Sequence, residues 1–124
     1  MASNILDMNG AHEFKYTTTG AVTVGTLLVV GTTPMVAMEA ATGSGQVISC
    51  AVGCEFSGTK KGAASTSLAA GGKAYYIVTG GVNKLTGLAA AGKLIGYATE
   101  AATTGATTAK VRLLPGPALL GSTS

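Results

Sequence analysis

The sequence predicts an all-β fold, a small single-domain barrel or sandwich with extended arms at both ends and at most one short helix. Segments rich in β-branched residues recur at short spacing and are separated by glycine pairs and Gly/Ser/Thr clusters, which is the pattern of many short strands. The two Ala-rich stretches, residues 63–70 and 88–91, are too short to form stable isolated helices. A chain of 124 residues has room for one domain.

Three weaker strand candidates precede the clearest one. They cover residues 14–18, 22–30 and 34–40. Within the second of them, Gly25 suggests a bulge or bend. Residues 46–56 form the clearest candidate, because side chains alternate between the two faces of an extended backbone. The face predicted to point into the core carries Ile48, Cys50, Val52, Cys54 and Phe56.

The second half of the chain contains a predicted hairpin and two further strands. Residues 74–79 and 82–85 are joined by Gly80-Gly81, and two glycines supply the positive φ angles that a tight hairpin turn needs. Residues 93–99 form the next strand. In residues 109–113, apolar side chains alternate with Lys and Arg, which indicates a half-buried strand with a charged outer face.

Both ends of the chain are predicted to be arms around a β domain of residues 20–114. Residues 1–19 form the N-terminal arm and residues 115–124 the C-terminal tail, since Pro115-Gly116-Pro117 cannot continue a β ladder. A chain lacking residues 2–16 is therefore expected to fold but to bind its partner weakly. The candidate contacts with that partner are the apolar residues of the arms: Ile5, Leu6, Met8, Phe14, Tyr16, Leu119 and Leu120.

The composition excludes several classes of protein. Charged residues make up 10% of the chain and the net charge is +3, with no basic stripe, so we expect no nucleic-acid partner. The longest apolar stretch is far too short to span a membrane, and no export signal is visible at the start. Two cysteines in such a chain indicate synthesis in a reducing cytoplasm. A small, nearly neutral surface is suited to packing against copies of itself or against a large partner.

The residues that could carry chemistry are sparse. His12 is the one histidine and lies in the predicted arm, which is a poor place to hold a catalytic base. In an extended strand Cys50 and Cys54 would lie about 13 Å apart, too far for a disulfide, which needs about 7 Å or less. Neither a phosphate-binding loop nor a zinc-ligand spacing is present. We therefore predict no catalytic residue, no cofactor, no metal site and no small-molecule substrate.

Several segments occur in a characteristic order. A small-residue turn precedes an aromatic strand, a short hairpin follows, then a Leu-Ile-Gly-x-Ala strand ending in Glu-Ala-Ala, and a final Val-Arg-Leu strand. These segments are residues 69–76, 85–86, 93–102 and 109–113, preceded by a central strand over residues 45–56. By this order and spacing, the chain resembles the capsid cement (head decoration) proteins of tailed bacteriophages over roughly residues 20–114. It departs from them in residues 1–19 and in its Pro-Gly-Pro tail.

The resemblance implies a non-enzymatic structural protein that binds the outer surface of a phage head and staples neighbouring capsomers. The implied partner is the major capsid protein. Because the chain has 10% charged residues and few large hydrophobic ones, we also expect it to associate with copies of itself, as a homotrimer or, failing that, a dimer. The protein would be made in the cytoplasm of the host bacterium and reside on the virion. The alternatives are another virion structural protein, of the tail or head surface, and a small carbohydrate-binding module displayed on the virion.

Overall fold

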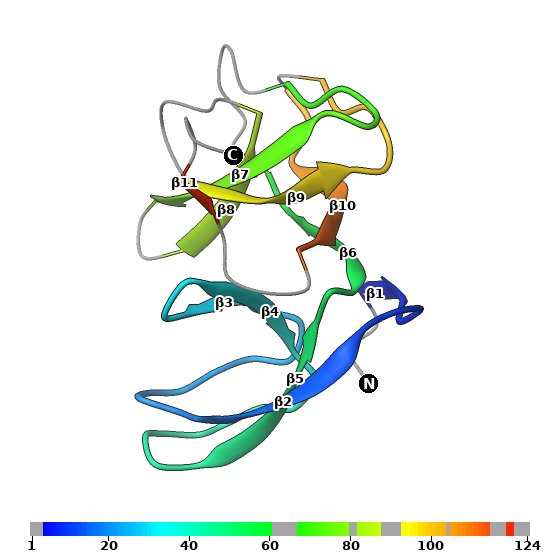
Figure 1. Ribbon diagram of the computed structural model, residues 1–124. Coiled ribbons are helices and arrows are strands. Elements are labelled where there is room, and N and C mark those ends of the chain that lie inside the picture. Colours follow the sequence, from blue (N-terminus) through cyan, green and yellow to red (C-terminus); the bar gives the residue numbers. More distant parts are fainter. Residues whose placement is uncertain are drawn as a thin grey trace.

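The computed structural model describes residues 4–60, 67–79, 82–87, 93–103, 105–114 and 119–120. Within these residues every regular element is a β-strand, so the prediction of an all-β fold is confirmed. The strands form two antiparallel sheets, which lie one above the other in Figure 1 and do not close into a barrel. This arrangement is compatible with the predicted sandwich. No helix in the described part of the chain is long and apolar enough to cross a membrane.

The larger sheet has seven strands and forms the upper half of Figure 1. Its order is β1-β6-β10-β9-β7-β8, and β11 pairs with β9 on the edge that β10 also uses. A single parallel bridge between Lys60 and Leu85 brings β8 back toward the end of β6, so the sheet curls. The strands are β1 (Ile5–Asp7), β6 (Glu55–Thr59), β7 (Lys73–Thr79), β8 (Val82–Thr86), β9 (Lys93–Ala98), β10 (Thr108–Leu113) and β11 (Leu119–Leu120).

The smaller sheet has four strands in the order β2-β5-β4-β3 and forms the lower half of Figure 1. Strand β2 pairs along its whole length with β5, from His12 opposite Val52 to Thr17 opposite Val47. Gly25 has a φ of +89° in the turn before β3, so the bend predicted at this glycine is confirmed. The strands are β2 (His12–Thr17), β3 (Leu27–Val30), β4 (Thr33–Ala37) and β5 (Val47–Val52).

The chain passes from the smaller to the larger sheet between β5 and β6. The sequence predicts one continuous strand over residues 46–56, but the strand is interrupted at Gly53, whose φ is +79°. A left-handed backbone angle of this kind is unfavourable for residues with a side chain, which explains a glycine at the crossing. Cys50 and Cys54 consequently lie in different packed clusters, and both are free thiols.

The buried apolar residues form two clusters, of which the larger holds the sheets together. The larger cluster fills the space between the sheets, where Val36 and Ala51 of the smaller sheet meet Phe56, Ile95 and Val111 of the larger one. The smaller cluster covers the opposite face of β5 and includes residues Met35, Ala37, Ile48, Cys50 and Val52. The five side chains predicted to face the core are all buried, as expected. Strand β5 is buried on both faces, because its two faces serve different clusters.

The predicted hairpin and final strands are present. Strands β7 and β8 pair from Tyr75 opposite Thr86 to Thr79 opposite Val82, while the joining Gly80-Gly81 lies outside the described residues. Only glycine fits at the third position of the Leu-Ile-Gly motif, since a Cβ at Gly96 would lie 2.0 Å from the carbonyl oxygen of Arg112. The alternation in β10 also holds, with its three apolar residues buried. The Ala-rich residues 63–66 and 88–91 lie outside the described residues.

The expectation that residues 1–19 do not pack on the domain needs correction. Strand β1 pairs with β6, and β2 pairs with all six residues of β5. Ile5 is only 7% exposed and belongs to the larger cluster. The sequence did not reveal this packing, because the segment's partners lie about 30 to 50 residues away along the chain. The boundaries predicted for a separate domain, residues 20–114, and for a tail, residues 115–124, remain predictions.

Candidate functional site

The chemically reactive side chains do not converge in the described part of the chain. His12 is exposed at the start of β2. Asp7 is engaged by Arg112, with 2.7 Å between the guanidinium nitrogen and the carboxylate oxygen. Among the described residues, no group of three or more His, Cys, Asp or Glu side chains is placed to hold a metal ion. The candidate functional sites of the described residues are therefore surfaces that could contact a partner.

The two cysteine thiols are buried and poorly reactive. Burial raises the pKa of the Cys50 thiol to about 11, and the negative charge of Glu39 acts in the same direction. Burial also raises the pKa of Cys54 to about 11, partly opposed by a backbone hydrogen bond and the charge of Arg112. A raised pKa keeps both thiols protonated at neutral pH, and the thiolate is the reactive form.

These pKa values predict a loss of stability at alkaline pH. Each thiol binds its proton more tightly in the folded chain than in the unfolded chain. Its contribution to the free energy of unfolding is therefore complete below about pH 9 and is lost as the pH rises toward 11. One pKa unit corresponds to about 1.4 kcal/mol, so the loss is on the order of 2 to 3 kcal/mol per thiol. Urea unfolding from pH 7 to 10.5 should show this decline, and a Cys50→Ala, Cys54→Ala variant should show a shallower one. Equal slopes in the two proteins would contradict the burial of the thiols.

The structure separates the predicted contact residues into different environments. Leu6 and Phe14 are exposed, at 47% and 40%. Ile5 is buried, and Met8 and Tyr16 are partly buried against the two clusters, so these three contribute to packing. Leu119 and Leu120 form β11, opposite Leu94 and Lys93 of β9. The seven residues are therefore not brought together in one patch.

A groove between the two sheets was not apparent from the sequence. It has a volume of about 510 Å³ and runs along residues 21–28, residues 56–59 and Asn83. The Asn83 amide donates a hydrogen bond to the Leu27 carbonyl at 2.8 Å, and the Asn4 amide donates to the carbonyls of Gly25 and Ser57 at 3.0 and 3.1 Å. The lining of the groove contains apolar residues, among them Val24, Leu27 and Leu28, and hydroxyl-bearing residues, among them Thr23, Thr26 and Ser57. None of the lining residues is charged.

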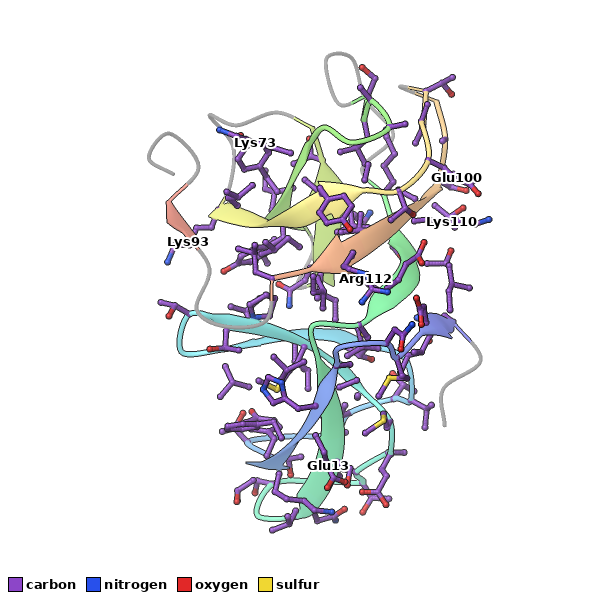
Figure 2. All side chains as sticks on the ribbon, turned by 45° about the vertical axis from the view of Figure 1, so that its right-hand side comes forward. Glu13, Lys73, Lys93, Glu100, Lys110 and Arg112 are labelled. Carbon is purple, nitrogen blue, oxygen red and sulfur yellow. The ribbon has the colours of Figure 1, made fainter. Side chains whose placement is uncertain are left out.

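Charge is unevenly distributed over the molecule. Residues 8–54, which contain the whole smaller sheet, hold only three charged residues, namely Glu13, Lys15 and Glu39. The larger sheet instead carries a row of polar side chains across its outer face. The residues of this row lie directly opposite one another on neighbouring strands, so their side chains point the same way. In Figure 2, Glu100, Lys110 and Arg112 lie together on this upper half, far from Glu13. The row consists of Asp7, Glu55, Arg112, Tyr97 and Lys73.

Arg112 connects distant parts of the chain across this outer face. Its guanidinium pairs with Asp7 and donates hydrogen bonds to the carbonyl oxygens of Asn9 and Gly53 at 2.8 and 3.0 Å. It thereby holds the N-terminal segment and the β5–β6 crossing against β10. Sequence reasoning identified Arg112 only as part of a charged strand face, since the pairing joins residues 105 positions apart. This arrangement is structural, because every partner is a group of the protein itself.

The two-sheet β fold, the uncharged groove and the charge-poor half formed by residues 8–54 offer surfaces suited to contacts with other proteins. The model of the phage cement protein family matches residues 8–113, most of the chain. The chain therefore belongs to the phage cement protein family. No curated protein and no solved structure matches it significantly.

Membership of this family supplies the broad function. The protein is a phage structural protein associated with the virion capsid. Its family is a structural one and is not known for catalysis. The resemblance noted in the sequence is thus confirmed at the level of the family.

Proposed function

We propose that this protein binds the outer surface of the assembled phage head and staples neighbouring capsomers of the major capsid protein. The family match over residues 8–113 is the observation that carries this proposal. From the composition we expect a homotrimer at three-fold or quasi-three-fold positions, with a dimer at two-fold positions as the alternative. We expect synthesis in the cytoplasm of the host bacterium, followed by addition to the head.

An oligomer can staple capsomers firmly even when each contact is modest. Once one subunit is bound, the others are held at a high effective concentration near their own sites, so avidity exceeds the affinity of any single contact. A stable contact between two chains buries about 1,000 Å² or more in total. The charge-poor half favours such contacts, because few charges have to lose their water.

We assign the main capsid contact to the surface around the groove. Val24 is 49% exposed at its rim, and the lining residues contain no charge that an apolar partner would leave unpaired. Leu6 and Phe14 remain candidate contacts because both are exposed. Leu119 and Leu120 also remain candidates. Ile5 is buried in the core, and a contact role for it would require the core to open.

A charged residue at the groove should weaken capsid binding. Val24→Asp places a carboxylate on the proposed contact, where it would lose water without gaining a partner, and should weaken binding at least about tenfold. Decoration of capsids that lack the protein can be measured by co-sedimentation. Tyr97→Asp is the matched control, because Tyr97 is similarly exposed, at 46%, but lies on the charged outer face. If Tyr97→Asp weakens binding and Val24→Asp does not, the assigned surface is wrong.

Binding to capsids should depend little on salt. Ionic strength screens contacts between exposed charges, but it has a small effect on apolar contacts. Between about 50 and 500 mM NaCl we expect the affinity for expanded capsids to change by less than about threefold, whereas a contact with many charge pairs would weaken steeply. A steep loss of binding with salt would show that the charged face of the larger sheet carries the contact instead.

A further inference from the structure

The outer edge of the smaller sheet is formed by a long, exposed strand. Strand β2 has β5 as its hydrogen-bonded neighbour and ends the sheet order β2-β5-β4-β3. Five of its six residues are exposed. In Figure 1 it runs across the lower half of the molecule. An edge of this length presents unpaired backbone groups and is a template for pairing with another strand.

The backbone geometry determines which residues of β2 can pair outward. The Thr18 N–H donates to the Gln46 carbonyl at 2.8 Å and continues the β2–β5 register. Because successive residues point their backbone groups to opposite sides, the even-numbered residues of β2 bond to β5. Glu13, Lys15 and Thr17 therefore point their N–H and C=O groups away from the sheet.

Charge then selects one register for pairing with an identical strand. Antiparallel pairing of β2 with its copy must place two odd-numbered residues opposite each other to form hydrogen bonds. A register centred on Glu13 brings two glutamates together, and one centred on Lys15 brings two lysines together. Only the register centred on Phe14 places Glu13 opposite Lys15 of the second copy, and it does so twice. Opposite charges directly across a sheet stabilise the pair, whereas like charges destabilise it.

We propose that β2 is a self-association surface through which two copies of this chain form a two-fold symmetric dimer with one continuous eight-stranded sheet. Phe14 lies on the two-fold axis, flanked by two reciprocal Glu13–Lys15 pairs. The occupant of this edge is thus a second copy, because the strand is complementary in charge to itself. Because a strand that pairs with its own copy closes with two subunits, this contact favours the dimer at two-fold positions over the three-fold trimer.

The apolar face of β2 supports the same pairing. Phe14 is directly opposite Cys50 and Tyr16 is opposite Ile48, so both aromatic side chains lie on the face of the sheet that carries the smaller cluster, and Tyr16 packs against that cluster. In the proposed dimer the exposed Phe14 ring meets Phe14 of the second copy, and Tyr16 lies opposite His12. Aromatic pairs across neighbouring strands stabilise a sheet. On the other face, Lys15 lies 3.2 Å from Glu13 and 2.7 Å from the Ser49 hydroxyl, which holds the charged side chains along the strand.

A mixing experiment with charge variants tests the register. Glu13→Lys makes every cross-strand pair Lys–Lys, and Lys15→Glu makes every pair Glu–Glu, so each variant alone should dissociate at least about tenfold more readily than the wild type. An equimolar mixture of the two should again form dimers, because every pair is then Lys–Glu. Sedimentation velocity over a range of concentrations measures the mass, and circular dichroism checks that each variant is folded. The proposal is overturned if the wild type is monomeric throughout, if the single variants keep its mass, or if mixing restores nothing.

A cysteine at the axis tests the same contact independently. In the proposed register Phe14→Cys brings two thiols together at a non-hydrogen-bonded pair, where the Cα atoms are about 4.5 Å apart and a disulfide can form. Thr17→Cys is the control, since its two copies would lie about 20 Å apart along the strands. We expect mild oxidation to cross-link the first variant and not the second. Equal cross-linking of both, or of neither, would overturn the proposal. All these measurements use the protein without capsids, so their failure is distinct from failure of capsid binding.

Discussion

Replacement of Phe56 with alanine should lower the free energy of unfolding by about 3–5 kcal/mol. The Phe56 side chain is completely buried in the larger cluster, between β1 and β10. Its ring packs against Gly58, where a Cβ would lie 2.6 Å from the ring carbon Cε2. Truncation would leave a cavity that this tightly packed region cannot close. Urea unfolding followed by circular dichroism measures the change.

The other phenylalanine of the chain provides the matched control. Phe14→Ala removes the same atoms from a ring that is exposed on the edge strand, so it should cost about 1 kcal/mol or less in the monomer. Measured at low protein concentration, the two variants should differ by at least about 2 kcal/mol. A similar loss in both would mean that Phe56 does not hold the two sheets together.

Deletion of residues 2–16 should abolish cooperative folding. The deletion removes β1 and most of β2, and with them the burial of Ile5 and the Asp7 partner of Arg112. Domains of this size are stable by only about 5–15 kcal/mol, and the loss of two strands exceeds what such a margin can absorb. This replaces the expectation drawn from the sequence, that the shortened chain folds and only binds capsids weakly. Proton spectra and thermal unfolding of the shortened chain give the answer.

Single substitutions at two neighbouring residues distinguish the loss of core packing from the shortening of the chain. Ile5→Ala should lower stability by about 2–4 kcal/mol because Ile5 lies in the core, while Leu6→Ala should change stability by about 0.5 kcal/mol or less because Leu6 is exposed. Should the shortened chain unfold cooperatively at the wild-type temperature, β1 and β2 would be dispensable for the fold, and the N-terminal segment would again be an arm.

Local patterns in the sequence were sufficient for most of the strands. Alternation predicted the buried face of β10 and the burial of Ile48, Cys50, Val52, Cys54 and Phe56, although these five side chains are divided between two clusters. Paired glycines predicted the β7–β8 hairpin. The family could also be recognised, because the order and spacing of its characteristic segments are properties of the sequence itself. Such features depend on near neighbours, so they can be read without knowledge of the fold.

Contacts between residues far apart in the chain were decided only by the tertiary structure. The packing of Ile5 on Phe56 and the pairing of Asp7 with Arg112 depend on which strands become neighbours. The sequence around Ile5 and Asp7 has no periodic pattern from which these partners could be predicted. The crossing at Gly53 also escaped prediction, since residues on both sides of it are apolar and alternate without a break. The groove has the same origin, because its walls come from residues 21–28, 56–59 and Asn83. The sequence by itself thus determined strands and family, while the surfaces for partners exist only once distant strands are paired.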